Sequence, residues 1–146
     1  MSIKVHHISI FISDMERTIF LFQDILGFKL TWHIPSAKGK KLSALLGIPD
    51  LECELAYLTS PDNDVAIELS RLINPVIKTS KVRFGNAGNM GLSLEVQNLD
   101  KLHKRLNKKG WSPLSLCLEM QSPDGDKIRA FCIRIEHCMT LEFIEL

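Results

Sequence analysis

Two glutamates and one histidine lie in strand-like segments and carry side chains that could bind a cation or move a proton. The histidine, His7, shares its strand face with Ser9. The glutamates, Glu68 and Glu142, each stand between apolar neighbours, in the sequences Ile-Glu-Leu and Leu-Glu-Phe. Side chains alternate between the two faces of a strand, so each glutamate points away from the apolar face. A carboxylate in such a place is costly unless it is paired, protonated or bound to a cation.

Each of these residues also has an interpretation without special chemistry. His7 would then be a strand histidine that is hydrogen-bonded inside the fold. Glu68 and Glu142 would be exposed on the open face of a sheet, which is common in antiparallel sheets. The residues alone leave both interpretations open.

The other histidines are weaker candidates for a site. His6 falls on the apolar face of its strand and is interpreted as a structural neighbour of the site. His33 and His137 could each serve as a substitute metal ligand, but a surface position is favoured for both. His103 is expected on the exposed side of a helix.

The elements that position these residues follow a β-α-β-β-β order. Residues 5–12 alternate as a half-buried strand does, and Ser13 or Asp14 can cap a following helix that ends at Gly27. Further strands are expected at residues 28–34, 52–59 and 65–69, with a short helix at residues 40–46.

The same order returns later in the chain. A shift of 84 positions places His7 on Gly91 and Ser9 on Ser93. Asn98 is expected to cap a helix that ends at Gly110. Further strands are expected at residues 111–120, 128–135 and 140–146.

This repeat predicts one α+β domain that is built from two modules. Module one covers about residues 1–73 and module two about residues 90–146. The polar and glycine-rich stretch at about residues 74–89 is interpreted as the linker.

Composition limits the class of protein. The 146 residues are 45% hydrophobic and 24% charged, with a net charge of +1, so nothing indicates a nucleic-acid or membrane partner. No signal peptide or membrane-spanning pattern is recognised, and a cytoplasmic location is expected. Without a C-x-x-C pair, the cysteines are expected to be buried free thiols rather than disulfides or zinc ligands. They are Cys53, Cys117, Cys132 and Cys138.

The motifs of the two modules resemble a known family. The opening H-H-I-S-I-x-I-S-D-M-E, the tandem β-α-β-β-β order and the closing Ile-Glu-Leu and Leu-Glu-Phe strands are similar to the glyoxalase / bleomycin resistance protein / dioxygenase superfamily, also called vicinal oxygen chelate. The resemblance covers essentially the whole chain. It implies a glyoxalase-like α+β fold in which two tandem βαβββ modules form a curved, cup-like mixed sheet around a divalent metal ion.

The resemblance also implies a set of metal ligands, two from each module. It assigns His7, Glu68 and Glu142 to three of the four places, around Mn, Ni, Fe, Mg or Zn, with water or substrate completing the shell. The fourth place is Gly91, which offers no side-chain donor. Residues 135–138 also depart from the family's D-P-D-G loop.

The activity that the resemblance implies is that of a metal-dependent lyase, isomerase or epimerase acting on a small carbonyl or thioester-like substrate. The metal would polarise an oxygen while Glu68 or Glu142 moves a proton. A ring-cleaving dioxygenase is disfavoured, because that chemistry uses two histidines and one carboxylate. The alternative is a metal-free, antibiotic-type binding protein or an inactive relative, with a cup lined by Phe11, Trp32 and Tyr57. Strand edges left by curved half-sheets favour a homodimer.

Overall fold

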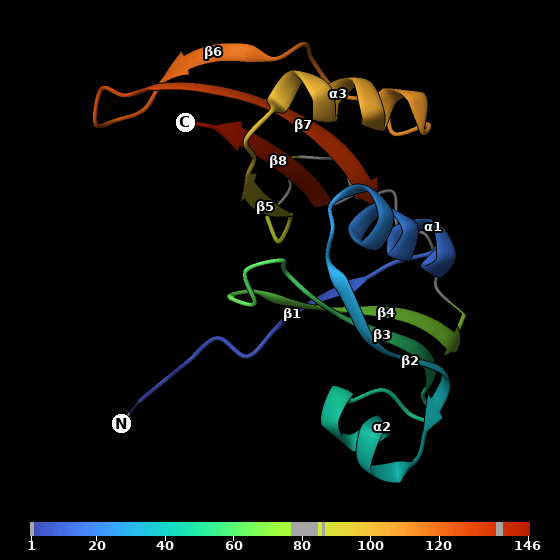
Figure 1. Ribbon diagram of the computed structural model, residues 1–146. Coiled ribbons are helices and arrows are strands. Elements are labelled where there is room, and N and C mark those ends of the chain that lie inside the picture. Colours follow the sequence, from blue (N-terminus) through green and yellow to red (C-terminus); the bar gives the residue numbers. More distant parts are fainter. Residues whose placement is uncertain (1, 77–84, 86, 137–138) are drawn as a thin grey trace. The chain divides into compact units, whose positions relative to one another are not determined.

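The computed structural model describes residues 2–76, 85, 87–136 and 139–146. Contacts divide the chain into two compact units, Met1–Thr79 and Ser80–Leu146 (Figure 1). Most of the predicted linker at residues 74–89 lies outside the described residues, as do His137 and Cys138. In the part of the chain that is described, no helix is long and apolar enough to cross a membrane.

The first unit contains one four-stranded mixed sheet with the strand order β1-β4-β3-β2. Strand β1 runs parallel to β4, and the other neighbouring strands are antiparallel. The elements are β1 (Ile8–Phe11), α1 (Met15–Phe20), a π-helix (Leu21–Ile25), β2 (Lys29–Lys38), α2 (Lys40–Leu46), β3 (Glu52–Thr59) and β4 (Ala66–Asn74).

The second unit repeats this topology, with the strand order β5-β8-β7-β6 and a parallel pair formed by β5 and β8. Its elements are β5 (Met90–Glu95), α3 (Leu99–Lys108), β6 (Leu118–Gln121), β7 (Lys127–Glu136) and β8 (Met139–Glu145). The expected pair of βαβββ modules is therefore confirmed, since each module folds into its own mixed sheet.

One predicted strand is wrong. Residues 111–120 do not form a continuous strand, because only Leu118–Gln121 pairs regularly with β7. Upstream of it, Pro113 makes a single isolated bridge to Ile133. Proline has no backbone N–H and cannot continue a hydrogen-bonded ladder. The carbonyl of Ser115 is instead bound by the ring of His103 on α3.

The predicted helix starts are confirmed. The Asp14 side chain accepts a hydrogen bond from the backbone N–H of Arg17, and Asn98 does the same for Lys101. Gly27 follows the first helix with a φ of +80°, which a residue without a Cβ adopts at little cost.

The apolar residues of each module's last strand face its core. Ile67 and Leu69 of β4 and Leu141 and Phe143 of β8 are fully buried. Because side chains alternate along a strand, the glutamate between each of these pairs points to the opposite side of its sheet. We call this side, which is turned away from the module's long helix, the open face.

Candidate functional site

The open face of the first sheet brings together a histidine, a glutamate and a serine. The Nε2 atom of His7 lies 3.8 Å from Oε1 of Glu68. The hydroxyl of Ser9 donates a hydrogen bond of 3.4 Å to the same oxygen, since Ser9 and Glu68 are partners in the parallel pairing of β1 and β4. The side chains of His7 and Glu68 are 30% and 22% exposed, so both can still meet a ligand.

A second histidine fixes the ring of His7. The Nδ1 atoms of His6 and His7 are 2.7 Å apart, so one ring donates a hydrogen bond to the other. If Nδ1 of His7 carries the proton, Nε2 is unprotonated. Its lone pair is then free to bind a metal ion beside Glu68. A hydrogen bond on the far nitrogen is the usual way in which a metal-binding histidine is oriented. His6 is therefore a neighbour of His7, but it is exposed beside His7 and Tyr57 and does not lie on the buried apolar face as expected.

Two aromatic residues extend this arrangement across the sheet. Tyr57 on β3 stands opposite Glu68, and Trp32 on β2 stands opposite Tyr57. The Trp32 and Tyr57 rings are stacked with their centroids 5.1 Å apart, and the rings of Tyr57 and His7 form a T-shaped pair with centroids 5.8 Å apart. A single row of side chains, Ser9, Glu68, Tyr57 and Trp32, therefore crosses all four strands.

The open face of the second sheet carries the corresponding row. Ser93 on β5 pairs with Glu142 on β8, and its hydroxyl donates a hydrogen bond to Oε2 of that glutamate. Cys132 on β7 stands opposite Glu142, in the place that Tyr57 has in the first sheet. Burial raises the pKa of the Cys132 thiol, and the charge of Glu142 raises it further.

Gly91 stands at the position that the resemblance gives to the fourth metal ligand. It pairs with Thr140, and a Cβ built on it would lie 3.4 Å from the Thr140 hydroxyl oxygen. Its φ lies outside the left-handed range, so the backbone does not require glycine there. This position therefore offers no metal ligand because glycine has no side chain, and not because the backbone conformation requires glycine.

The donors of the first unit fit a shared metal ion. Two ligands at about 2.0–2.2 Å from one ion can be at most about 4.4 Å apart, and His7 and Glu68 meet this limit. Imidazole and carboxylate suit the divalent ions named above. Among the described residues of each unit, no three histidine, cysteine, aspartate or glutamate side chains form a metal site. Glu142 of the second unit is the third ligand that the resemblance implies.

The sequence interpretation missed a buried carboxylate on the helix side of the first sheet. Glu54 on β3 is 8% exposed and accepts hydrogen bonds from Nε of Arg71 at 2.6 Å and from Nε2 of His33 at 2.7 Å. Burial alone would raise the pKa of Glu54, but the bonds and charges of His33 and Arg71 outweigh it and lower the pKa. Its position between Cys53 and Leu55 in a strand is the same signal that singled out Glu68.

The corresponding pair in the second unit has its charges reversed. Arg129 on β7 and Glu145 on β8 pair in register as Glu54 and Arg71 do on β3 and β4. The guanidinium of Arg129 lies 2.8 Å from Glu145 and 2.9 Å from both carboxylate oxygens of Asp100 on α3. Both pairs connect neighbouring strands on the side opposite the candidate ligands.

Several predicted positions need correction. His33 is exposed, as was favoured, and its ring binds Glu54 on the helix side instead of standing as a spare donor on the open face. His103 is partly buried, since its ring packs edge-on against Phe131 with centroids 4.9 Å apart. Cys53 is a buried free thiol as expected, whereas Cys117 and Cys132 are free but only half-buried. Phe11 lies on the same face of β1 as Ser9 and is 48% exposed, and its expected place in the lining of a cup stays a prediction.

Comparison with known families supports the assignment that these motifs imply. The family model of the Glyoxalase/Bleomycin resistance protein/Dioxygenase superfamily matches residues 4–115. The chain belongs to this superfamily. No curated protein matches it.

Solved structures of this glyoxalase-like fold are similar over nearly the whole chain. A glyoxalase family protein from Bacillus cereus has a TM-score of 0.85 at 20% identity, covering 99% of this chain and 95% of that one. A glyoxylase/bleomycin resistance protein/dioxygenase domain from Frankia sp. has a TM-score of 0.64 at 21% identity, with 99% and 98% covered.

A third solved structure contains a metal ion. The fosfomycin resistance protein FosX from Listeria monocytogenes, in complex with Mn(II) and sulfate, has a TM-score of 0.63 at 14% identity, covering 100% of this chain and 94% of that one. At these identities the structural likeness establishes the fold of the glyoxalase-like chain, and its chemistry rests on its own residues.

Proposed function

We propose that this superfamily member is a divalent-metal-dependent lyase, isomerase or epimerase of the glyoxalase type, acting on a small carbonyl or thioester-like substrate. His7, Glu68 and Glu142 would hold the metal. The observation that carries the proposal is the 3.8 Å approach of His7 Nε2 to Glu68 Oε1 on the open face, with both side chains still accessible. Mn(II) in the FosX structure supports a divalent ion in this fold without fixing its identity.

The bound metal would act as a Lewis acid that stabilises negative charge on a substrate oxygen. The protein's own part is to position groups around the reacting carbon. Glu142 accepts the Ser93 hydrogen bond through Oε2, so Oε1 is the atom that would either bind the metal or take and return a proton. Glu68 is held in the same way by Ser9. Both carboxylates are thus oriented by neighbouring strands before a substrate arrives.

A second function is favoured by a different observation. Trp32 and Tyr57 form a stacked, half-buried aromatic surface beside Glu68, and Gly91 provides no fourth donor. A metal-free binding protein would use the rings to hold a flat ligand and the polar side chains to hydrogen-bond it.

Metal analysis separates the two functions. Protein purified without chelator and without metal-affinity resin is expected to take up one equivalent of Mn, Ni or Zn in calorimetric titration. His7→Ala should weaken this binding at least tenfold, because it removes the only imidazole of the proposed set. His103→Ala is the matched control and should leave it unchanged. A wild-type protein that takes up no stoichiometric metal would support the binding protein instead.

We also propose that the protein works in the cytoplasm as a homodimer with a small-molecule ligand. The three described cysteines are free thiols, which suits a reducing compartment. Each sheet ends in strands with one unpaired side, which a second chain could cover.

A further inference from the structure

Strand β6 lies at the end of the second sheet and leaves one side of its backbone open. The strand order β5-β8-β7-β6 places it there, as Figure 1 shows. All four of its residues, Leu118–Gln121, are exposed. A strand edge with free peptide groups is a template for pairing with another chain.

The corresponding outer strand of the first sheet, β2, is protected. Its pairing with β3 has two irregularities, and Pro35 lies within the second of them, between Ile34 and Ala37. Bulges and proline at a sheet edge hinder pairing with another chain. In contrast, β6 pairs with β7 in a regular register and contains no proline.

The outward peptide groups of β6 belong to Glu119 and Gln121. The backbone N–H of Ser122 donates to the carbonyl oxygen of Asp126 across the turn that joins β6 to β7. Hydrogen-bonded and non-bonded pairs alternate along an antiparallel ladder. Met120 therefore bonds to β7, while the N–H and C=O groups of Glu119 and Gln121 point away from it.

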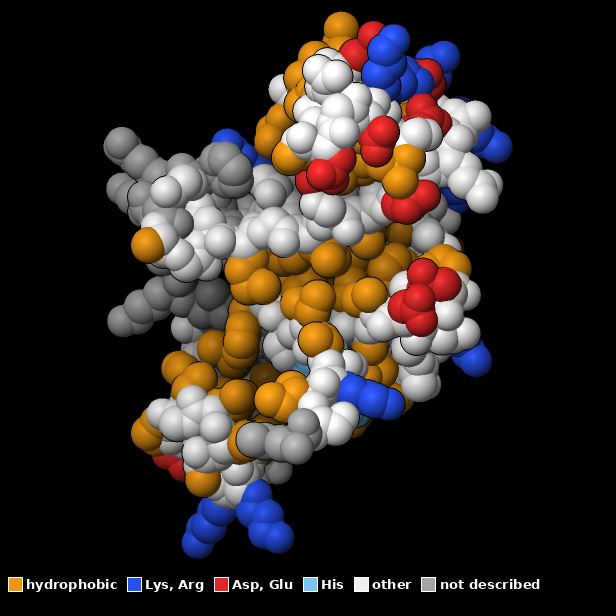
Figure 2. Space-filling model, turned by 90° about the vertical axis from the view of Figure 1, so that its left-hand side faces the viewer, with side chains coloured by type: hydrophobic (Ala, Val, Ile, Leu, Met, Phe, Trp, Pro, Cys, Tyr) orange, Lys and Arg blue, Asp and Glu red, His pale blue; other side chains and the backbone are white. Residues whose placement is uncertain are grey.

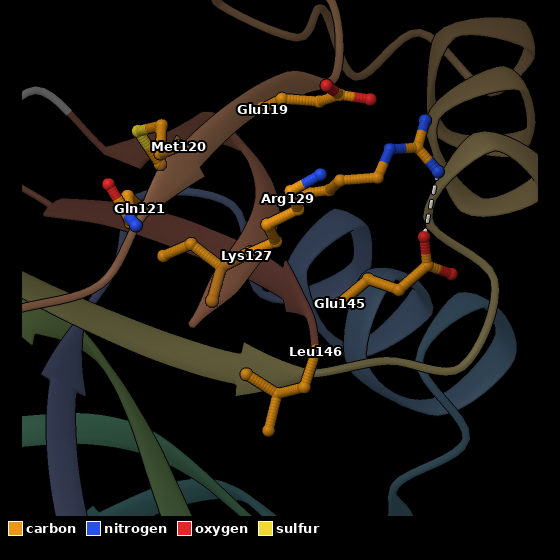
Figure 3. Close-up of a pocket in the computed structure, with 8 residues that line it drawn as sticks. Glu119, Met120, Gln121, Lys127, Arg129, Glu145 and Leu146 are labelled. Carbon is orange, nitrogen blue, oxygen red and sulfur yellow. Dashed lines mark hydrogen bonds and ion pairs between the residues drawn. The ribbon is translucent and has the colours of Figure 1, made fainter. Parts of the chain in front are cut away.

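The helix side of this edge carries two charges that lack a partner. Glu119 and Gln121 stand opposite Arg129 and Lys127 of β7, and these four side chains line a hollow of about 560 Å³ (Figure 3). Arg129 is neutralised by its ion pairs with Asp100 and with Glu145 of β8. Among the described residues, neither Glu119 nor Lys127 forms an ion pair.

The other side of the edge is apolar. Leu118 and Met120 point there and are 50% and 43% exposed. Hydrophobic side chains are also exposed elsewhere on the chain, as the view in Figure 2 shows, so exposure alone does not select an interface. At β6 it coincides with a free strand edge and with two unpaired charges of opposite sign.

We propose that β6 pairs antiparallel with β6 of a second copy, around a two-fold axis at Met120. Glu119 of each copy then stands opposite Gln121 of the other, and each such pair exchanges two backbone hydrogen bonds. On the apolar side the two Met120 side chains meet, and each Leu118 lies diagonal to Met120 of the second copy. The inference rests on the proposed homodimer and assigns its interface.

Charge and backbone chemistry select this register. Lys127 stands beside Gln121, so it lies two strands, or about 10 Å, from Glu119 of the second copy, and the two extended side chains together span that distance. An axis at Glu119 would set two carboxylates directly opposite each other, which destabilises a strand pair. An axis at Gln121 would set Glu119 opposite Pro123, which has no N–H to donate.

Complementary charge variants test the pairing between copies. Glu119→Lys and Lys127→Glu should each raise the dissociation constant of the dimer about tenfold in sedimentation velocity, because like charges then meet twice in each dimer. An equimolar mixture of the two variants restores opposite charges only between different copies. It should dimerise within about threefold of wild type. A mixture as weak as its components would contradict the assigned contact.

A backbone variant tests the ladder. Gln121→Pro removes an outward N–H and no bond to β7, so it should raise the dissociation constant about 30-fold through two lost hydrogen bonds in each dimer. Leu45→Asp on α2, where leucine is 79% exposed in the first unit, is the control and should leave it unchanged. Circular dichroism checks that each variant is folded, and the charge variants decide if Gln121→Pro is not.

The outcomes separate this inference from the rest of the proposed function. A wild-type dimer that none of the β6 variants weakens would overturn the interface and keep the homodimer. A wild-type monomer at about 100 μM would overturn both. Calorimetric titration of the same protein with manganese reports on the metal site independently of either result.

Discussion

Glu54 and Glu68 lie on neighbouring strands but on opposite faces of one sheet, and the two faces give them different roles. Glu54 is closed in by Arg71 and His33 on the helix side. Glu68 remains accessible beside His7 on the open face. A carboxylate whose partners are all internal stabilises the fold, whereas one with an accessible oxygen can serve a ligand.

The internal role of Glu54 predicts a pH-dependent loss of stability. Its pKa is lower in the folded protein than in the unfolded chain, so its contribution is present above the ordinary glutamate pKa of about 4.3 and is lost as pH falls through the lowered value. Glu54→Gln is expected to reduce the free energy of unfolding by about 2 kcal/mol at neutral pH. Urea titrations at pH 7 and pH 3 should show the gap between variant and wild type narrowing in acid.

Glu52 on the same strand is the matched control for Glu54. Its partners are the Ser36 hydroxyl and Lys38, whose side chain is 68% exposed. Glu52→Gln should cost less than about 1 kcal/mol at neutral pH, as exposed pairs do. Equal losses in the two variants would contradict the role assigned to Glu54.

Gly91 stands at the fourth ligand position that the resemblance implies, so a side chain with a donor atom there is expected to raise metal affinity. Gly91→His adds an imidazole where the fold already accepts a Cβ against Thr140, so metal binding should tighten about tenfold, or about 1.4 kcal/mol, in calorimetry with manganese, nickel and zinc. Gly91→Ala makes the same steric change without a donor and should leave affinity as it is. Tightening in both variants would show that sterics, not ligation, cause the effect.

The sequence predicted one part of the site and not the other. Alternation along β4 and β8 placed Glu68 and Glu142 on the open faces, and the alternation expected for residues 5–12 did the same for His7, which directly precedes β1, because burial of the neighbours fixes the side on which a strand residue points. The bonds of Glu54 join three consecutive strands through residues that are 17 and 21 positions away in the sequence. No local pattern contains such a contact, and it appears only once the register is known.

At the scale of elements, helix starts were the most predictable features. Asp14 and Asn98 each satisfy a backbone N–H of the first helical turn, and this is a local interaction. Residues 111–120 were mispredicted because their apolar alternation resembles a strand, whereas Pro113 and the contact of His103 with Ser115 interrupt the pairing.

Capping makes a measurable contribution to α3. Asn98→Ala should lower the free energy of unfolding by about 1 kcal/mol in urea titration, because the backbone N–H of Lys101 loses its acceptor. Asn107→Ala, near the other end of α3, is the comparison and should change stability by less than about 0.5 kcal/mol. The capping role of Asn98 fails if the two variants are equally stable.

At the scale of the whole chain, the internal repeat predicted the fold most fully. Two stretches with the same order of strand, cap and helix gave sheets with matching strand orders, β1-β4-β3-β2 and β5-β8-β7-β6. Repetition makes each module an independent check on the interpretation of the other.

The unpaired sides of the outer strands predict self-association. Light scattering coupled to size-exclusion chromatography is expected to give twice the chain mass of 16.6 kDa. The measured mass should stay constant over a tenfold dilution from about 100 μM. A strict monomer at the highest concentration would contradict the homodimer.

The reversed charges of the two cross-strand pairs have a consequence for how the repeated chain folds. In a chain with two similar modules, a strand of one module can pair wrongly with a strand of the other during folding. If β4 paired with β7 in the native register, Arg71 would stand opposite Arg129, and β3 paired with β8 would set Glu54 against Glu145. Like charges placed directly opposite destabilise a strand pair. The charges on β3 and β4, and on β7 and β8, therefore favour pairing within each module over pairing with the equivalent strand of the other module.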